Sequence, residues 1–582
     1  MRALKRLWFL SIFTSCFASD RSASLNCCKA FPESDSWPSK SAWLSLNETL
    51  EGNLIAAIPP ASVCHSDRPN YDNATCAEVT KLWTTSWEFH ADDPVSVGEN
   101  NWSNDTCLPN PNAPCTGHGY PIYVVNASKP EHVQTGIKFA RDNNVRLVVK
   151  GTGHDFRGRT AAPYSLSIWT RHLRGTRFHE AYQTCGALPA DDLNFYSGPA
   201  ITVAAGENNG AALALANEHG LMVHVGSAPS VGVGGFLTGG GQTLFSSQKG
   251  LATDAVLEFS IVLPNGDIVT ASACQNTDVF WAVRGGGGST IGIVLNFTVK
   301  TFPSIPITST TFGFSSPTLV NDAFWSALTY MATQMTMLVT AGITMYASVV
   351  PPINESTSWS FSGKFMGLNQ SSIDTRGYLA PIAEHFNVSY GSDILASLTE
   401  IQEWPSFYDW WSKQVDATPM GIDLAFASRI LDEKALNHPN FTDLIKQAAG
   451  TGGVAFNGVS GPGTHAYPAD FNAACPAWRV GYVHSIVGAV WSPFNTTAKS
   501  AAIENLTNVT SAALRKLAPD TGSYVNEASP YEPNYQNAFW GSNYPRLLSI
   551  KRKLDPTDVF WCEACVGSER WYIRDDGALC RT

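Results

Sequence analysis

A glycine-rich turn that contains a histidine constrains the fold of this chain more than any other feature. The turn spans residues 150–159, Lys-Gly-Thr-Gly-His-Asp-Phe-Arg-Gly-Arg, and follows an apolar, strand-like run. Because glycine lacks a Cβ atom, such a turn brings backbone N–H groups close to an anion such as a pyrophosphate. The imidazole of His154 beside it could bond covalently to a cofactor. One glycine-rich turn is a weak signal, and an ordinary polar loop with a hydrogen-bonded histidine is the alternative.

Length and charge narrow the possible classes of protein. A chain of 582 residues is too long for one hydrophobic core, so we expect two to four domain-like units. The content of 44% hydrophobic and 15% charged residues is typical of a globular protein. The net charge of -11 argues against nucleic-acid binding, which needs a basic surface.

The first residues indicate export. A basic start, an apolar run over residues 7–13 and small residues at 18 and 19 predict a signal peptide over residues 1–19. The run is too short to span a bilayer, so we expect secretion, into the medium or the secretory pathway, and no membrane contact. Candidate glycosylation sites on an exported chain are frequent: Asn47, Asn73, Asn101, Asn104, Asn126, Asn296, Asn354, Asn369, Asn387, Asn440, Asn495, Asn505 and Asn508.

The cysteines support export. Cys16 would leave with the signal peptide, and the others form an even set clustered near the two ends of the chain, as disulfides would be. The pair Cys562 and Cys565 could instead be half of a zinc site, but no second pair lies nearby, so we expect a disulfide and no metal. Spacing leaves the pairing open.

The chain divides by its patterns into several segments. Residues 20–118 lack periodicity and predict an irregular, disulfide-tied N-terminal region. Regular structure begins in residues 119–305 with a strand over 122–125, a helix from Pro130 capped by Ser128, and a strand over 146–149. Further elements are predicted as strands over 201–204, 221–225, 256–263 and 291–294, a helix over 211–218, and a hairpin turn at Asn265-Gly266.

The glycine-rich pattern stops near residue 305. Residues 306–495 mix strand-like runs, such as 344–350, with helical runs and with an aromatic group over 404–411, and predict a second domain that contacts substrate. Residues 496–582 are interpreted as a return to the first domain.

Several motifs in a fixed order resemble one family. They are the turn over 151–159, Pro-Ser-Val-Gly-Val-Gly-Gly over 229–235, three glycines over 239–241, Phe-Trp-Ala-Val-Arg followed by four glycines over 280–288, Tyr-Val-Asn-Glu over 524–527, and Gly-Ser-Asn-Tyr-Pro-Arg-Leu over 541–547. Together they resemble secreted fungal FAD-linked oxidases of the berberine-bridge-enzyme-like group, in the vanillyl-alcohol-oxidase superfamily. A nicotinamide-binding Rossmann protein fits less well, because no Gly-x-Gly-x-x-Gly opens a helix with an acidic residue about 20 residues later.

The resemblance implies an α+β fold, with a two-lobed PCMH-type FAD-binding domain and an inserted substrate domain of antiparallel sheet and helices. It implies FAD linked covalently through His154 to the 8α-methyl group of the flavin. The other cofactor-binding residues that it implies are Gly151, Thr152, Gly153, Asp155, Gly158, Arg159, Gly226, Ala228, Pro229, Val231, Gly232, Gly234, Gly235, Gly239, Gly240, Gly292, Ile293, Asn543 and Tyr544.

Two positions refine that expectation. Many relatives carry a second flavin-linking cysteine where this chain has Ala228, so we expect one bond only. Val231 matches a position that resembles a gate for dioxygen, where valine goes with oxidases. An ordinary packing valine is the alternative.

The family chemistry implies that a base removes a substrate proton, that hydride passes to flavin N5, and that dioxygen then yields hydrogen peroxide. Tyr524, Asn526 and Glu527 are the candidate catalytic residues, with Tyr524 the first candidate for base or orienter. His224 and His465 are weaker candidates. We expect a small alcohol, a sugar or a secondary metabolite as substrate, and a monomer. The alternatives are an FAD-dependent dehydrogenase or oxidative-cyclisation enzyme, and a non-catalytic secreted glycoprotein that keeps the fold.

Overall fold

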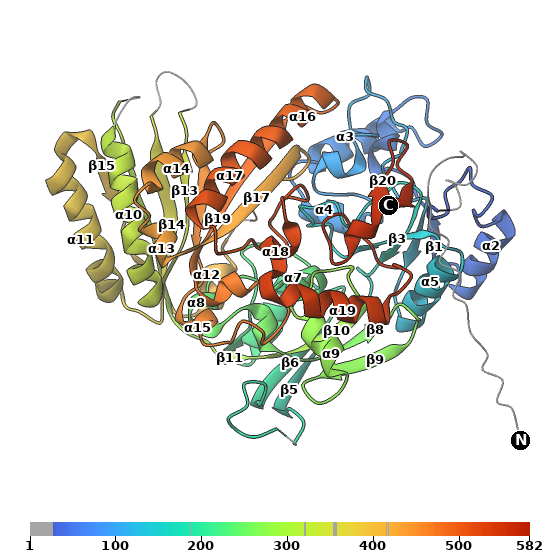
Figure 1. Ribbon diagram of the computed structural model, residues 1–582, viewed down its shortest axis with the longest axis horizontal. Coiled ribbons are helices and arrows are strands. Elements are labelled where there is room, and N and C mark those ends of the chain that lie inside the picture. Colours follow the sequence, from blue (N-terminus) through green and yellow to red (C-terminus); the bar gives the residue numbers. More distant parts are fainter. Residues whose placement is uncertain (1–26, 187, 319–321, 353–357, 415, 417) are drawn as a thin grey trace, which may run out of the picture.

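The computed structural model describes residues 27–582 except 187, 319–321, 353–357, 415 and 417. The predicted signal peptide and Asn354 therefore lie outside the described residues. The fold is α+β and has two lobes (Figure 1). Among the described residues, one lobe contains a four-stranded sheet, a five-stranded sheet and two short two-stranded sheets, and the other contains a single broad sheet with long helices against it.

A four-stranded sheet positions the glycine-rich turn. Its order is β1 (Leu54–Ala56), β2 (Tyr123–Asn126), β4 (Ser165–Trp169) and β3 (Arg146–Lys150), and the last three strands are parallel. Helix α5 (Pro130–Asp142) connects β2 to β3, so the predicted strand–helix–strand unit is confirmed. The N-cap of α5 is Lys129, and the predicted cap by Ser128 is wrong.

The second sheet of this lobe is antiparallel. Its order is β5 (Thr176–Gln183), β6 (Ser197–Ala204), β10 (Ile293–Lys300), β8 (Val256–Val262) and β9 (Ile268–Ser272). The predicted hairpin at Asn265-Gly266 joins β8 to β9, with Gly266 at φ +87°. Strand β7 (Leu221–Met222) is shorter than predicted and pairs outside this sheet, with β11 (Phe302–Pro303). The helices of this part are α6 (Asn209–Glu218), α7 (Val233–Gly239), α8 (Ser246–Lys249) and α9 (Thr277–Val283).

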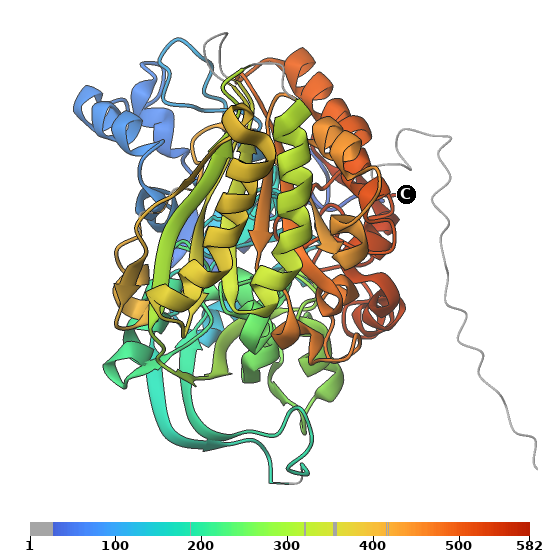
Figure 2. The same cartoon turned by 90° about the vertical axis from the view of Figure 1, so that its left-hand side faces the viewer.

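The second lobe contains the expected antiparallel sheet. Its strands are β12 (Ile307–Ser315), β13 (Ile343–Val350), β14 (Ser360–Leu368), β15 (Leu395–Leu398), β16 (Gln402–Trp404), β17 (Asp423–Asp432), β18 (Val454–Gly458) and β19 (Gly481–Trp491). Figure 2 shows α10 (Asp322–Thr340) and α11 (Ser372–Tyr390) lying across one face of this sheet. The other helices are α12 (Phe407–Trp411), α13 (Glu433–Leu436), α14 (Phe441–Ala449), α15 (Pro462–His465), α16 (Thr496–Asn505) and α17 (Ser511–Leu517).

The chain returns to the first lobe later than predicted. Leu514 and Leu517 of α17 are buried in the same core as Phe456 of β18, so this helix belongs to the second lobe, although the sequence predicted the return at residue 496. Trp540 and Leu547 lie in the core of the first lobe. The returning elements are α18 (Tyr535–Trp540), α19 (Tyr544–Leu554), β20 (Trp571–Ile573) and β21 (Leu579–Arg581).

The N-terminal region is more regular than the sequence indicated. Its described part contains three α-helices, α2 (Lys40–Thr49), α3 (Asn73–Leu82) and α4 (Trp87–Asp92), so the expected irregularity holds only outside these helices. The expected disulfides are present there as Cys64–Cys76 and Cys107–Cys115. Further bonds between described residues are Cys28–Cys580, Cys185–Cys274 and Cys562–Cys565.

Cys475 departs from the expected even set, because it is a buried free thiol. The pair Cys562–Cys565 is a disulfide, as the sequence favoured over zinc.

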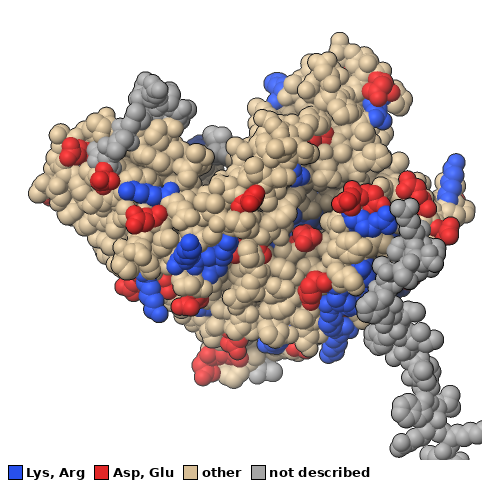
Figure 3. Space-filling model, turned by 45° about the horizontal axis from the view of Figure 1, so that its top comes forward, with Lys and Arg blue, Asp and Glu red and all other residues tan. Residues whose placement is uncertain are grey.

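The surface bears on the expectations about charge, membrane contact and glycosylation. On the face in Figure 3, acidic and basic side chains are interspersed. No α-helix in the described part of the chain is long and apolar enough to cross a membrane. Asn101 is buried and its side chain accepts a hydrogen bond from the Leu424 N–H, so it is not a surface acceptor for a glycan. Other candidate acceptors are exposed, namely Asn73, Asn104, Asn369, Asn387, Asn440, Asn495, Asn505 and Asn508.

A buried ion pair joins the two lobes, and removing it tests its contribution to stability. Arg479 donates two hydrogen bonds to Asp254, at 2.7 and 2.8 Å, and both side chains are buried. The substitution Asp254→Asn leaves the guanidinium without its counter-charge, and we expect the free energy of unfolding to fall by about 3 kcal/mol or more. The apparent melting temperature measures the effect. The matched change Glu51→Gln removes the exposed pair with Lys129 and should leave that temperature unchanged. Equal melting of both variants would contradict this role.

Candidate functional site

A cavity of 660 Å³ collects most of the residues that the sequence singled out. Its walls come from the turn after β3, from the segment before α7, from the segment before β10, and from one face of the sheet in the second lobe. The predicted cofactor-binding residues that line it are Gly151, Thr152, Gly153, His154, Asp155, Arg159, Gly226, Ala228, Val231, Gly232, Gly234, Gly235, Gly292 and Ile293.

Six other predicted cofactor contacts do not line the cavity: Gly158, Pro229, Gly239, Gly240, Asn543 and Tyr544. Some of these residues shape the walls. A Cβ atom on Gly239 would lie 2.1 Å from the Asn526 amide nitrogen, and one on Gly158 would lie 2.6 Å from the Trp102 ring.

Asn543 and Tyr544 have other partners. The Asn543 amide donates hydrogen bonds to three backbone carbonyls, those of Ala469, Asn472 and Ala474. The Tyr544 hydroxyl donates to Glu569. These contacts brace the C-terminal segment and leave neither side chain directed at the cavity.

His154 lies against Trp87 in the wall of the cavity. The two rings are stacked, with centroids 3.5 Å apart and planes 17° apart. Nε2 lies 2.8 Å from the Ser230 hydroxyl, and Nδ1 is buried without a hydrogen-bond partner among the described residues. Burial lowers the pKa of the imidazole to about 3. The ring is therefore neutral, as a nitrogen nucleophile must be.

An ion pair shapes the remainder of the turn. The Asp155 carboxylate accepts hydrogen bonds from the backbone and the side chain of Arg159, and the two side chains form a salt bridge of 2.5 Å. Arg159 Nη2 donates to Asn526 at 3.1 Å, which connects the turn to the C-terminal segment. Nη1 of the same guanidinium is buried without a partner among the described residues, which suits an anionic ligand.

Glu527 lies in the wall of the same cavity. Its two carboxylate oxygens accept hydrogen bonds of 3.1 and 3.0 Å from the Gln242 amide, and His484 Nδ1 is 3.5 Å away. Burial raises the pKa of this carboxyl to about 7, against the opposing effect of Gln242. His484 adds no charge, because burial lowers its pKa to about 3. Glu527 thus has the pKa of a general base that works near neutral pH.

Tyr524 is better suited to orient a substrate than to act as a base. Its hydroxyl oxygen accepts hydrogen bonds from the Gly241 N–H at 3.1 Å and from the Asn526 amide at 3.0 Å. Burial, with the nearby charge of Glu527, raises its pKa well above the usual value for a phenol. A neutral hydroxyl that accepts twice keeps its own proton for a substrate oxygen.

A row of side chains that the sequence did not predict crosses the second sheet. In the strand register Lys364 lies beside Tyr346, Tyr346 beside Asn457, and Asn457 beside His484. The first three line the cavity, and His484 approaches Glu527. The alternation along each strand could have shown which side chains share a face, but not which strands are neighbours.

The other histidine candidates have ordinary partners. His224 Nδ1 lies 3.0 Å from the Thr243 hydroxyl, and His465 Nε2 lies 2.7 Å from the Gly481 carbonyl oxygen. Neither side chain lines the cavity.

The cavity residues fit FAD. Glycines leave open wall space at several points, since a Cβ atom on Gly235 would meet nothing within 4 Å. Two buried polar atoms, Arg159 Nη1 and His154 Nδ1, lack partners within the described residues, and the first suits an anionic group of the cofactor.

Two family models match the chain. The FAD binding domain model matches residues 121–272, and the berberine and berberine-like model matches residues 523–567. Both segments contribute walls to the cavity.

Several fungal proteins are similar over almost the whole chain. FAD-linked oxidoreductase ZEB1 of Gibberella zeae and VAO-type flavoprotein oxidase VAO615 of Thermothelomyces thermophilus are each 32% identical, with 95% of both chains covered. Bifunctional decalin synthase calF of Penicillium decumbens is 30% identical over 95% of both chains. The crystal structure of VAO-type flavoprotein MtVAO713 from Myceliophthora thermophila C1 matches with a TM-score of 0.88 and 30% identity, covering 96% of this chain and 100% of that one.

The chain therefore belongs to the vanillyl-alcohol-oxidase and berberine-bridge-enzyme family of FAD-linked oxidoreductases. It is an oxidoreductase with an FAD-binding domain.

Filling the cavity should displace the cofactor without harm to the fold. Gly235 in α7 and Gly377 in α11 both have open space at the Cβ position, but only Gly235 lines the cavity. We expect Gly235→Leu to weaken FAD binding by about tenfold or more, since its side chain would overlap the ligand. The ratio of flavin to protein absorbance measures occupancy. Gly377→Leu is the matched control and should keep full occupancy. If both variants hold FAD equally, the cofactor lies elsewhere.

Proposed function

We propose that this protein is a secreted oxidase, with FAD linked covalently through His154, that oxidises a small alcohol and passes the electrons to dioxygen. The observation that carries the proposal is the position of Glu527, a carboxyl group with a pKa of about 7 in the wall of the cavity that His154 also lines. Bound FAD supplies the two-electron acceptor for the hydride. The residues of the chain bind and orient the substrate and move its proton.

Glu527 takes the proton of the substrate hydroxyl in this proposal. Gln242 holds the carboxylate through both oxygens, which fixes its orientation toward the cavity. Tyr524 donates its free hydroxyl proton to the same substrate oxygen, and Asn526 holds Tyr524 in place. Removing the proton from the hydroxyl raises the electron density at the carbon that must release hydride.

The cavity walls favour an alcohol with an apolar body. Aromatic and aliphatic side chains from the second lobe form one part of the wall, among them Met366, Trp410, Phe426 and Ile486. Polar side chains from that lobe also line the cavity: Tyr346 and Asn457 lie on the side of the sheet nearest Glu527, and Lys364, Gln414, Asp416 and Thr418 are further polar members of the wall. The apolar part of the wall suits a molecule with an aromatic or alicyclic body, whose hydroxyl would lie at Tyr524 and Glu527.

Further features support the oxidase assignment and the secretory location. Val231 is half-buried in the cavity wall, where a small side chain leaves room for dioxygen beside the cofactor. A relative is named an oxidase. The disulfides suit an oxidising compartment. We propose a monomer, with no nucleic-acid or membrane partner.

A second candidate is oxidative ring closure within secondary metabolism. A relative named decalin synthase favours it. The formation of hydrogen peroxide with each turnover of a simple alcohol would separate the oxidase from this alternative and from a dehydrogenase.

The pH dependence of turnover tests the base. Aromatic alcohols such as benzyl alcohol are the first probes, with peroxide detection. A base acts in its ionised form, so kcat/KM should rise with pH through about 7 and then level off. Glu527→Gln should lower kcat/KM by about 10²- to 10⁴-fold and remove the rise. Glu218→Gln, an exposed carboxyl group, is the control. A Glu527→Gln variant with the full rate and the same pH profile would assign the base to another group.

The covalent bond is tested on the purified protein. After acid precipitation and a denaturing gel, we expect flavin fluorescence on the protein band, and peptide mass mapping should place the flavin on the peptide that contains His154. His154→Ala should release all flavin into the supernatant, because Ala228 offers no second link. Release from the unaltered protein would mean that the cofactor is bound without a bond.

A further inference from the structure

We propose that Ser230 and Asp416 form a positioning pair that holds His154 in one tautomer, with the lone pair on Nδ1, and so directs the flavin bond to that nitrogen. The inference rests on the covalent link proposed above and adds which atom forms it and which residues prepare that atom. Asp416 comes from the segment of the second lobe between α12 and β17, whereas His154 and Ser230 come from the first lobe.

The hydrogen bonds allow one distribution of protons among His154, Ser230 and Asp416. Ser230 Oγ lies 2.8 Å from His154 Nε2 and also contacts the Asp416 carboxylate oxygen Oδ2. A carboxylate can only accept, so the single hydroxyl proton of Ser230 goes to Asp416. Ser230 must then accept from Nε2–H of the imidazole. A neutral imidazole carries one N–H, so Nδ1 carries the lone pair.

The surroundings of Nδ1 agree with this assignment. Nδ1 has no hydrogen-bond partner among the described residues, although it is buried. The neighbouring basic side chains, Lys150 and His90, have other hydrogen-bond partners. Lys150 Nζ donates to the backbone carbonyls of His90, Ala91 and Asp93. The ring nitrogens of His90 lie 2.7 Å from the Ser96 hydroxyl and 2.8 Å from the Trp83 carbonyl oxygen. Ser230 is therefore the group that sets the tautomer.

Trp87 contacts both His154 and the segment that carries Asp416. Its ring stacks on the imidazole and sets the plane of His154. Its indole N–H donates to the Thr418 carbonyl at 3.1 Å, and the Thr418 N–H donates to Asp416 Oδ1 at 3.1 Å. One side chain of the N-terminal region thus holds the nucleophile and the segment that carries its carboxylate partner.

The bond-forming reaction balances with dioxygen as the oxidant. One C–H bond of the flavin 8α-methyl group is replaced by a bond from that carbon to Nδ1. The proton on Nε2 leaves through Ser230 toward Asp416, and the methyl proton leaves to solvent. The two electrons of the C–H bond enter the flavin ring, and dioxygen takes them up with both protons to give hydrogen peroxide. A carboxylate that accepts the Nε2 proton makes Nδ1 a better nucleophile as the bond forms.

The rate of bond formation tests the pair. Protein produced under riboflavin limitation is mixed with FAD, and acid-insoluble flavin is followed over time against total bound flavin. We expect Ser230→Ala and Asp416→Asn to bind FAD but to link it about 10- to 100-fold more slowly, as removing such supporting partners does at other sites. Ser230→Thr keeps the hydroxyl and should restore most of the rate. Ser412→Ala, a change of an exposed serine on the segment that carries Asp416 and outside the cavity lining, is the control and should link at the unaltered rate.

The atom of attachment is a second measurement. Nuclear magnetic resonance of the isolated flavin peptide from the unaltered protein should show the bond at Nδ1. A bond at Nε2, or normal linking rates in both Ser230→Ala and Asp416→Asn, would overturn the pair while leaving the link to His154 intact. Absence of any acid-insoluble flavin in the unaltered protein would instead overturn the covalent link itself.

Discussion

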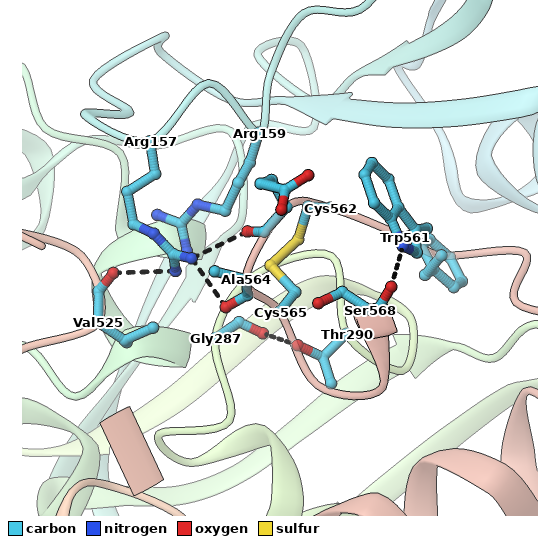
Figure 4. The surroundings of a disulfide bond; sticks show 12 residues. Arg157, Arg159, Gly287, Thr290, Val525, Trp561, Cys562, Ala564, Cys565 and Ser568 are labelled. Carbon is cyan, nitrogen blue, oxygen red and sulfur yellow. Dashed lines mark hydrogen bonds between the residues drawn. A yellow bond between two sulfur atoms is a disulfide. The ribbon is translucent and has the colours of Figure 1, made fainter. Parts of the chain in front are cut away.

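The site depends on the hydrogen bonds that the buried guanidinium of Arg157 donates to backbone carbonyls. It donates to the Val525 carbonyl at 3.2 Å and to the carbonyls of Glu563 and Ala564 at 3.0 and 2.9 Å, next to the Cys562–Cys565 disulfide (Figure 4). These contacts join a turn near residue 157 to a segment more than 360 residues later in the chain. Because Val525 lies between Tyr524 and Asn526, the same bonds bring the candidate catalytic residues to the turn that carries His154.

Burial then sets the protonation states around the cavity. It raises the pKa of Glu527 to about 7 and lowers the pKa of His154 and of His484 to about 3. One physical cause thus produces a carboxyl group able to take a proton and a neutral imidazole able to form a bond. Residues of both lobes line the cavity in which these groups lie.

The sequence predicted the first lobe well because its signals are local. The turn after β3, the helix from Pro130 and the hairpin at Gly266 each depend on a few neighbouring residues. The predictions were wrong where contacts between residues far apart in the chain determine the structure. The N-terminal helices were masked by a polar, proline-rich composition, and α17 joins the second lobe because Leu514 finds its core there. Cys475 is a buried free thiol, and spacing along the chain does not show which cysteines meet.

The sequence by itself determined the family, the FAD-binding turns and the side chains that could react, since spacing along one chain defines a motif. It singled out His154, Tyr524, Asn526 and Glu527, and all four line one cavity. Only the tertiary structure decided their roles. Gln242 and His484 flank Glu527, Trp87 stacks on His154, and Ser230 connects that histidine to Asp416. Each of these contacts joins residues far apart in the chain, so its existence depends on how the lobes pack and not on any local pattern.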